Sequence, residues 1–149
     1  MSEVITADLV DLDLKATDRQ SASRQLAQRL VEAGRVTDIE GFLADVVKRE
    51  SQMPTGLEGG IGIPHCRSAY VTEPSLAFGR SGDGVDFGAP DGPADIIFLL
   101  AAPEGGASHM KTLAALARRL IRAQFKQRLR TVTDPAEAAE YIRSELDQA

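Results

Sequence analysis

The chain has little of what several common functional sites require. Among its 149 residues there is one cysteine, Cys66, so no internal disulfide can form, and a lone thiol is typical of a reducing compartment. Two histidines, His65 and His109, add few further ligands, so the sequence predicts no metal site. Lys and Arg number 17 against 22 Asp and Glu, and the net charge of −5, without a basic cluster, argues against nucleic-acid binding.

Long hydrophobic runs and targeting signals are also lacking. The longest apolar run, from Ile96 to Ala102, is too short to span a membrane. The first ten residues, MSEVITADLV, have no basic start followed by an apolar stretch, so they predict no signal peptide. With 43% hydrophobic and 26% charged residues, the composition is that of an ordinary globular domain. We therefore expect one cytoplasmic domain over residues 1–149.

Periodicity in the first 50 residues predicts one strand and two helices. Apolar and polar residues alternate from Val10 to Lys15, which is a strand pattern. Asp18 can cap a first helix that ends at Gly34. The spacing from Thr37 to Glu40 is that of a capping box, and it opens a second helix that runs to about Glu50. The residues expected to face inward on that second helix are Ile39, Phe42, Leu43, Val46 and Val47.

The remainder alternates short apolar runs with turn signals and then becomes helical. The expected strands are Ile61 to Cys66, a piece at Tyr70, Ser75 to Phe78, Val85 to Phe87 and the fully apolar Ala94 to Ala102. Helices are expected from Ser108, around Phe125, and from the Asp134-Pro135 pair. The predicted order is β-α-α-β-β-β-β-α-α-α. This order is typical of an α/β protein with a mixed, mostly five-stranded sheet flanked by helices.

The stretch from Thr55 to Arg67, TGLEGGIGIPHCR, holds four glycines and His65. It lacks the Gly-Lys-Ser/Thr ending of a Walker loop. A dinucleotide fingerprint starting at Gly60 would place its third glycine at position 65, where the histidine stands, so it fails as well. The glycines either make a plain turn between helix and strand or bring the backbone close to a ligand or partner. The sequence predicts no bound cofactor.

The two histidines are the candidates for chemistry. Each follows a glycine-rich loop, and His109 would lie in the first turn of a helix, where free N–H groups favour an anion. Arg49 would lie at the end of the second helix, near the first loop. Neighbouring residues on a strand point to opposite faces, so His65 and Cys66 should not act together. A phosphate would suit two histidines and an arginine, although structural roles for all three residues remain an alternative.

These motifs resemble a known family. The first is Arg49-Glu50 followed by Thr55-Gly56 and the run from Gly60 to Arg67, and the second runs from Ala101 to Leu120. Together they are similar to the signatures of the fructose/mannitol-type enzyme IIA domain of the bacterial phosphoenolpyruvate-dependent sugar phosphotransferase system. The resemblance covers about residues 9–146.

The resemblance implies a role for each matching residue. His65 would take a phosphoryl group from the phosphocarrier protein HPr and pass it to a cysteine of enzyme IIB, which makes the chain a phosphotransferase component. His109 would contact the phosphate or His65, and Arg49 would offset its charge. Contact with a membrane would be indirect, through enzyme IIC. The family often has Gly-Asn-Gly where this chain has Glu58 to Gly60, and alanine where it has Gly62.

Three functions stay open at this point. The pattern around Cys66-Arg67 favours a fructose-type domain of sugar uptake. A nitrogen-type regulatory enzyme IIA on the same scaffold would carry the same phosphohistidine but would signal through its phosphorylation state. A small-ligand binding module would carry no covalent phosphate. In the first two, a neutral imidazole near pH 7 already holds a lone pair and needs no general base.

Overall fold

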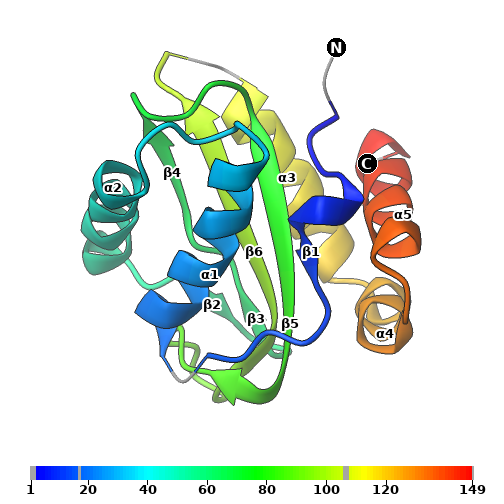
Figure 1. The fold of residues 1–149 in the computed structure, drawn as a ribbon. Helices are drawn as coiled ribbons and strands as arrows, with labels where there is room; N and C mark the ends of the chain where they lie inside the picture. The colour runs from blue at the N-terminus through cyan, green and yellow to red at the C-terminus, as the bar shows by residue number, and fades with distance from the viewer. Residues whose placement is uncertain (1–2, 17, 106–107, 149) are drawn as a thin grey trace.

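The structure is a computed structural model that describes residues 3–16, 18–105 and 108–148, with the backbone alone given for 108 and 109 (Figure 1). Along the chain its elements are η1 (Ala7–Leu9), β1 (Val10–Asp11), α1 (Arg19–Glu32), α2 (Ile39–Gln52), β2 (Gly56–Leu57), β3 (Ile61–Gly62), β4 (His65–Ser68), β5 (Ser75–Val85), β6 (Ala94–Pro103), α3 (Ser108–Leu120), α4 (Ala123–Thr131) and α5 (Pro135–Gln148). The described residues thus form five α-helices, in the predicted order.

The strands form one mixed sheet. Its order is β1-β5-β6-β3-β2, and β4 pairs with β6 beyond β3. β3 and β4 run parallel to β6 in one continuous register, with Ile61 opposite Ile96 and His65 opposite Leu100. They are therefore two parts of one strand, interrupted at Ile63-Pro64. The predicted α/β class and mixed sheet are confirmed, with six strands in the described residues where about five were expected.

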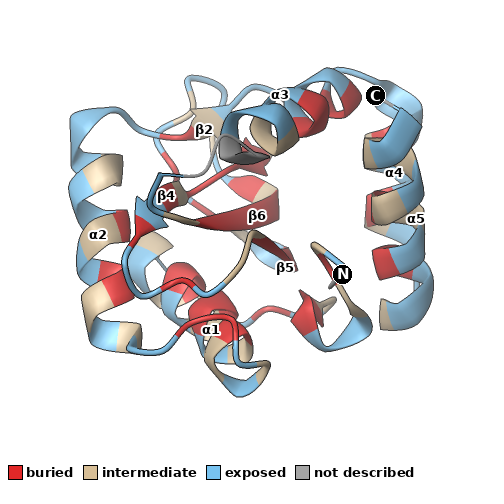
Figure 2. Ribbon diagram, turned by 90° about the horizontal axis from the view of Figure 1, so that it is seen from above, coloured by how far each residue is buried: buried red, intermediate tan, exposed pale blue. Residues whose placement is uncertain are grey.

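The core lies around β6. All of its residues except Asp95 and Pro103 are buried, which confirms the predicted central strand. Phe98 stacks on Phe78, its partner in β5, with ring centroids 5.0 Å apart. Seen from above, α1 covers one face of β5 and β6, and α3 covers the other (Figure 2). A strand covered on both faces needs apolar side chains on both, which explains the uninterrupted apolar run.

Three strand predictions are wrong. The strand expected from Val10 to Lys15 ends at Asp11, because Leu12 and Asp13 form a turn. Ser75 to Phe78 and Val85 to Phe87 were expected to be separate strands around a turn, but β5 is continuous from Ser75 to Val85. The strand pairs with β6 up to Arg80 and again at Val85, and the glycines of the expected turn lie in the register shift between these two residues. Tyr70 lies in a turn rather than a strand.

The first helix confirms its predicted ends. The carboxylate of Asp18 accepts a bond from the Ser21 N–H at 2.7 Å, and Gly34 follows the helix with a φ of 76°. The capping box predicted for the second helix is wrong. Asp38, not Thr37, is the N-cap of α2, and its carboxylate accepts from the Glu40 N–H at 3.2 Å.

The inward face of α2 is narrower than predicted. Phe42, Leu43 and Val46 are buried as expected. Val47 is 48% exposed, because it lies on the rim of the groove between α1 and α2. Ile39 is only partly buried.

The glycines after Thr55 have structural roles in this fold. Gly59 and Gly60 take φ values of 95° and 80° in the turn between β2 and β3. Gly62 lies against an aromatic ring, since a Cβ placed there would be 2.6 Å from a ring carbon of Phe87. These contacts favour the plain-turn alternative for this loop.

Gly62 therefore provides a test of packing. We expect Gly62→Ala to lower the free energy of unfolding by about 1–3 kcal/mol, because the added methyl group must displace the Phe87 ring. Urea unfolding measures the loss. Gly82→Ala is the matched control, since a Cβ at Gly82 meets no atom within 4 Å. Equal losses in the two variants would contradict the packing argument.

The first and last segments of the fold lie together at the β1 edge of the sheet, opposite β4 (Figure 1). α5 packs on η1 and β1, and Arg143 donates a bond to the Ile5 carbonyl at 2.7 Å. Within the described ranges, no helix is long and apolar enough to cross a membrane.

Candidate active site

His65 is the first residue of β4, just after the interruption in the strand. Pro64 has no N–H, and its carbonyl accepts from the Leu100 N–H at 3.0 Å, which restarts pairing with β6. The His65 ring folds back so that Nδ1 lies 2.7 Å from the Ile63 carbonyl oxygen. A carbonyl only accepts, so Nδ1 must carry the proton and donate it. The lone pair of the neutral ring is then on Nε2.

The surroundings of His65 keep its ring neutral. Burial lowers the pKa of His65 below its ordinary value of 6.5, and the positive charge of Arg49 lowers it further. The bond to Ile63 and the charge of Glu50 act in the opposite direction, but the net shift is downward. At pH 7 the ring is therefore mostly uncharged.

This shift predicts a pH dependence. An NMR titration of His65 is expected to give a midpoint below 6.5. As the pH falls, the unfolded chain takes up this proton before the folded chain does. The contribution of neutral His65 to stability is therefore complete above about pH 6.5 and is lost as the pH falls through the lower pKa of the folded protein. A midpoint at or above 6.5 would show that the ring is not held as described.

His65 opens onto a surface pocket between α2, β4 and the start of α3. Its lining residues are Asp45, Lys48, Arg49, Gln52, His65, Cys66, Arg67, Glu104, Met110 and Leu113. Three of them, Lys48, Arg49 and Arg67, are cations, and none of the three is in an ion pair with a residue that the structure describes. An anion in this pocket would meet positive charges that have no other partner among the described residues.

The predicted site residues have different outcomes. Arg49 lies with His65 in this pocket, as expected. The backbone of His109 is in the first turn of α3, as expected, but its side chain lies outside the described residues. The next residue, Met110, lines the pocket, so this end of α3 borders the site.

Sequence reasoning did not name Lys48 and Gln52, which also line the pocket. A signal for them existed, because Asp45, Lys48, Arg49 and Gln52 are spaced as one face of a helix. That face could be recognised only once Arg49 was taken as a site residue. Met110 is 59% exposed although it is apolar.

Cys66 also lines the pocket, but its surroundings do not favour a reactive thiol. It is buried, and burial with the nearby charge of Asp45 raises its pKa to about 12. The thiol stays protonated at neutral pH and is a poor nucleophile. Thr55, the first residue of the glycine-rich stretch, is also buried, and its hydroxyl donates to Glu50 at 2.6 Å.

Comparisons with known proteins show which family this chain is similar to. The family model described as "Phosphoenolpyruvate-dependent sugar phosphotransferase system, EIIA 2" matches residues 3–145. A fructose-specific EIIABC component of Bacillus subtilis is 34% identical over 131 residues, which are 87% of this chain but 21% of that protein. A fructose-specific EIIA component of Haloferax volcanii is 35% identical over 131 residues, or 87% of this chain and 85% of that one. The chain thus spans about a fifth of the first relative and most of the second.

Solved structures include both sugar-type and nitrogen-type proteins. The nitrogen regulatory protein IIA-Ntr of Neisseria meningitidis has a TM-score of 0.83 at 29% identity and covers 96% of each chain. The mannitol IIA of Escherichia coli has a TM-score of 0.78 at 26% identity, covering 93% of this chain and 98% of that one. Because the family model matches residues 3–145, which are nearly the whole chain, the chain belongs to the EIIA 2 family of the phosphoenolpyruvate-dependent sugar phosphotransferase system.

Proposed function

We propose that residues 1–149 are a fructose-type enzyme IIA domain that carries a phosphoryl group on His65. The observation that supports this most directly is the bond from Nδ1 to the Ile63 carbonyl, which leaves the nucleophilic lone pair on Nε2. Nε2 attacks the phosphorus of phosphorylated HPr, and the phosphorus–nitrogen bond to the HPr histidine breaks with its electron pair going to that ring. A cysteine thiolate of enzyme IIB then attacks the same phosphorus, and the bond to Nε2 breaks.

The pocket supplies what such a transfer needs. The phosphoryl group adds negative charge to a site that has three cations, of which Arg49 acts on His65 most directly. Phosphoryl transfer depends mainly on alignment and charge stabilisation, and a fixed ring with nearby cations provides both. His109, in the first turn of α3, is the second proposed site residue, with a contact to the phosphate or to His65. The pocket is open, which suits partners that dock in turn.

A second function has its own support. Nitrogen regulatory proteins are among the relatives, including one of Bradyrhizobium diazoefficiens that is 30% identical over 136 residues, 90% of this chain and 88% of that one. In that role His65 would be phosphorylated in the same way, and the phosphorylated and free forms would differ in binding to a regulator.

One assay separates these functions. The protein is incubated with phosphoenolpyruvate, enzyme I and HPr, and then with the IIB protein of a fructose system. We expect an acid-labile, base-stable phosphate that disappears when IIB is added. Phosphate that forms but is not passed to IIB would favour the regulatory function. A protein that takes up no phosphate at all would overturn both and favour a binding module.

A further inference from the structure

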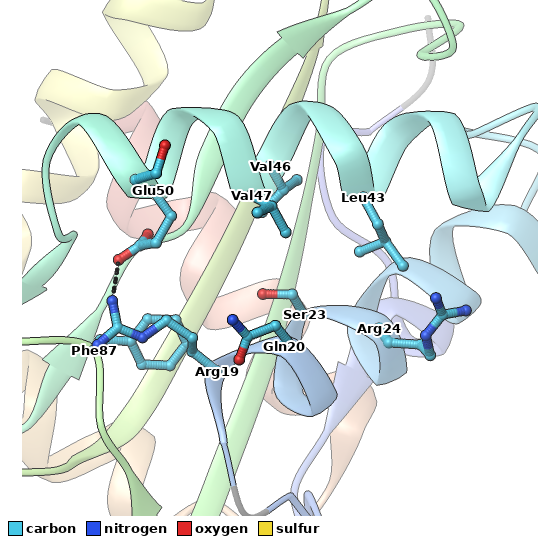
Figure 3. A pocket seen from close by; sticks show the side chains of 10 residues that line it. Arg19, Gln20, Ser23, Arg24, Leu43, Val46, Val47, Glu50 and Phe87 are labelled. Carbon is cyan, nitrogen blue, oxygen red and sulfur yellow. Dashed lines mark hydrogen bonds and ion pairs between the residues drawn. The ribbon is translucent and has the colours of Figure 1, made fainter.

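Two neighbouring residues of α2 face different parts of the molecule. Arg49 lines the pocket of His65, whereas Glu50 lines a separate pocket of about 290 Å³ between α1 and α2 (Figure 3). Consecutive helical residues point about 100° apart, which explains the division. Glu50 is therefore not among the residues that line the His65 pocket, whereas Arg49 is.

The Glu50 carboxylate is largely buried and accepts three hydrogen bonds. Its side chain is 10% exposed. Oε2 accepts from the Thr55 N–H at 2.9 Å and from Nη1 of Arg19 at 3.2 Å, and Oε1 accepts from the Thr55 hydroxyl at 2.6 Å (Figure 3 shows the pair with Arg19). A charge this deeply buried is tolerated because each oxygen has donors. Glu50 thereby holds the backbone and the side chain of Thr55 at once.

From Thr55 the contacts lead directly to the reacting ring. The Thr55 carbonyl accepts from the Ile63 N–H at 3.2 Å. The Ile63 carbonyl accepts from Nδ1 of His65 at 2.7 Å. Pro64 stands between Ile63 and His65, and its ring fixes its φ. The position of Ile63 therefore determines where the Ile63 carbonyl points relative to the His65 ring.

We propose that Glu50 is a positioning residue for His65, which acts through Thr55 and the Ile63 carbonyl without touching the phosphoryl group. The carboxylate fixes Thr55, Thr55 fixes Ile63, and the Ile63 carbonyl selects the tautomer with the proton on Nδ1. A loop that moves by a fraction of an ångström would weaken this last bond and allow the proton to reach Nε2, where it blocks attack. The importance of this arrangement for catalysis rests on the proposed function, but the effect on the tautomer does not.

The main test is Glu50→Gln, a variant of the same size. The amide can offer only one oxygen, so it cannot accept from both Thr55 groups and from Arg19. We expect the ¹⁵N shifts of the two His65 ring nitrogens, which are well separated for a single tautomer, to move toward each other. We also expect phosphorylation by HPr to slow roughly 10- to 100-fold.

The chain offers a matched control. Glu40 is on the same helix and pairs with Arg24, as Glu50 pairs with Arg19, but it lies about 15 Å away along α2. Glu40→Gln is expected to change neither the tautomer nor the rate. Thr55→Ser, which keeps the hydroxyl, should behave like the parent, whereas Thr55→Val should behave like Glu50→Gln. The Thr55 pair keeps the test available if Glu50→Gln does not fold.

The outcomes separate the inference from the proposed function. Unchanged ¹⁵N shifts in Glu50→Gln and Thr55→Val would overturn the inference, even if both variants were less stable, because Glu50 would then be a structural clamp only. Shifts that converge, together with slower phosphorylation, would support it. The shifts are measured without any phosphate donor, so they test the positioning of His65 even if the parent protein fails to accept phosphate from HPr.

Discussion

Replacing His65 with alanine is expected to abolish phosphoryl acceptance from HPr altogether. Among the described residues, the neighbouring thiol of Cys66 cannot replace the imidazole as a nucleophile, because it is buried and has a pKa of about 12. Incubation with phosphoenolpyruvate, enzyme I and HPr, followed by intact mass measurement, gives the result directly. The parent should gain one phosphoryl group, and the variant should gain none.

Cys66→Ala is the control for this prediction. The substitution removes the only thiol of the chain but leaves the His65 ring and its bond to the Ile63 carbonyl in place. It should be phosphorylated as the parent is, with the lability to acid of a phosphohistidine. If the His65→Ala protein is still labelled, the assignment of the phosphorylated residue is wrong.

Arg49→Gln is expected to slow phosphoryl transfer about 100-fold while leaving His65 able to react. A donor aimed at developing charge in a partly enclosed site contributes an effect of this size when it is removed. The variant also carries a second signature. Because the charge of Arg49 lowers the pKa of His65, its loss should raise that pKa, and the acid limb of the rate profile should move to higher pH. Phosphoryl labelling, quenched at set times over a series of pH values, measures both the rate and its pH dependence.

Arg24→Gln is the matched control for Arg49. Arg24 is an exposed arginine of α1 that pairs with Glu40, away from the His65 pocket. Its replacement should change neither the rate nor the pH profile. A rate in Arg49→Gln equal to that of the parent would show that the cation of this site is another residue, such as Lys48.

Local signals explain which parts of the fold could be predicted. The N-cap Asp18, the left-handed Gly34 and the apolar run of β6 depend on residues close together in the sequence. The division of β5 into two strands was wrong because glycines usually mark turns, whereas here the strand resumes its pairing with β6 at Val85 after a register shift. The end of β5 is determined by a partner strand, which the local sequence does not specify.

The same distinction applies to the site. Arg49 and His65 could be named from the sequence because a family motif carries them, and their shared pocket agrees with that. The Ile63 carbonyl and the Glu50 carboxylate could not be named, because their roles depend on hydrogen bonds that form only after α2, the loop and β3 come together. The role of His109 stays a prediction, since its side chain lies outside the described residues.

The meeting of the first and last segments at the β1 edge affects how the protein can be tethered. η1 and α5 lie beside β1, and three strand spacings, roughly 15 Å, separate β1 from β4 across β5 and β6. The described residues nearest the two ends line one pocket with Lys111 and Thr112 of α3, and they are Glu3, Val4, Leu146 and Asp147. Lys111 directly follows Met110, which lines the His65 pocket. A tag or resin attached at either end is therefore expected to lie near the start of α3, so binding measurements with HPr and IIB as free partners call for a long flexible linker.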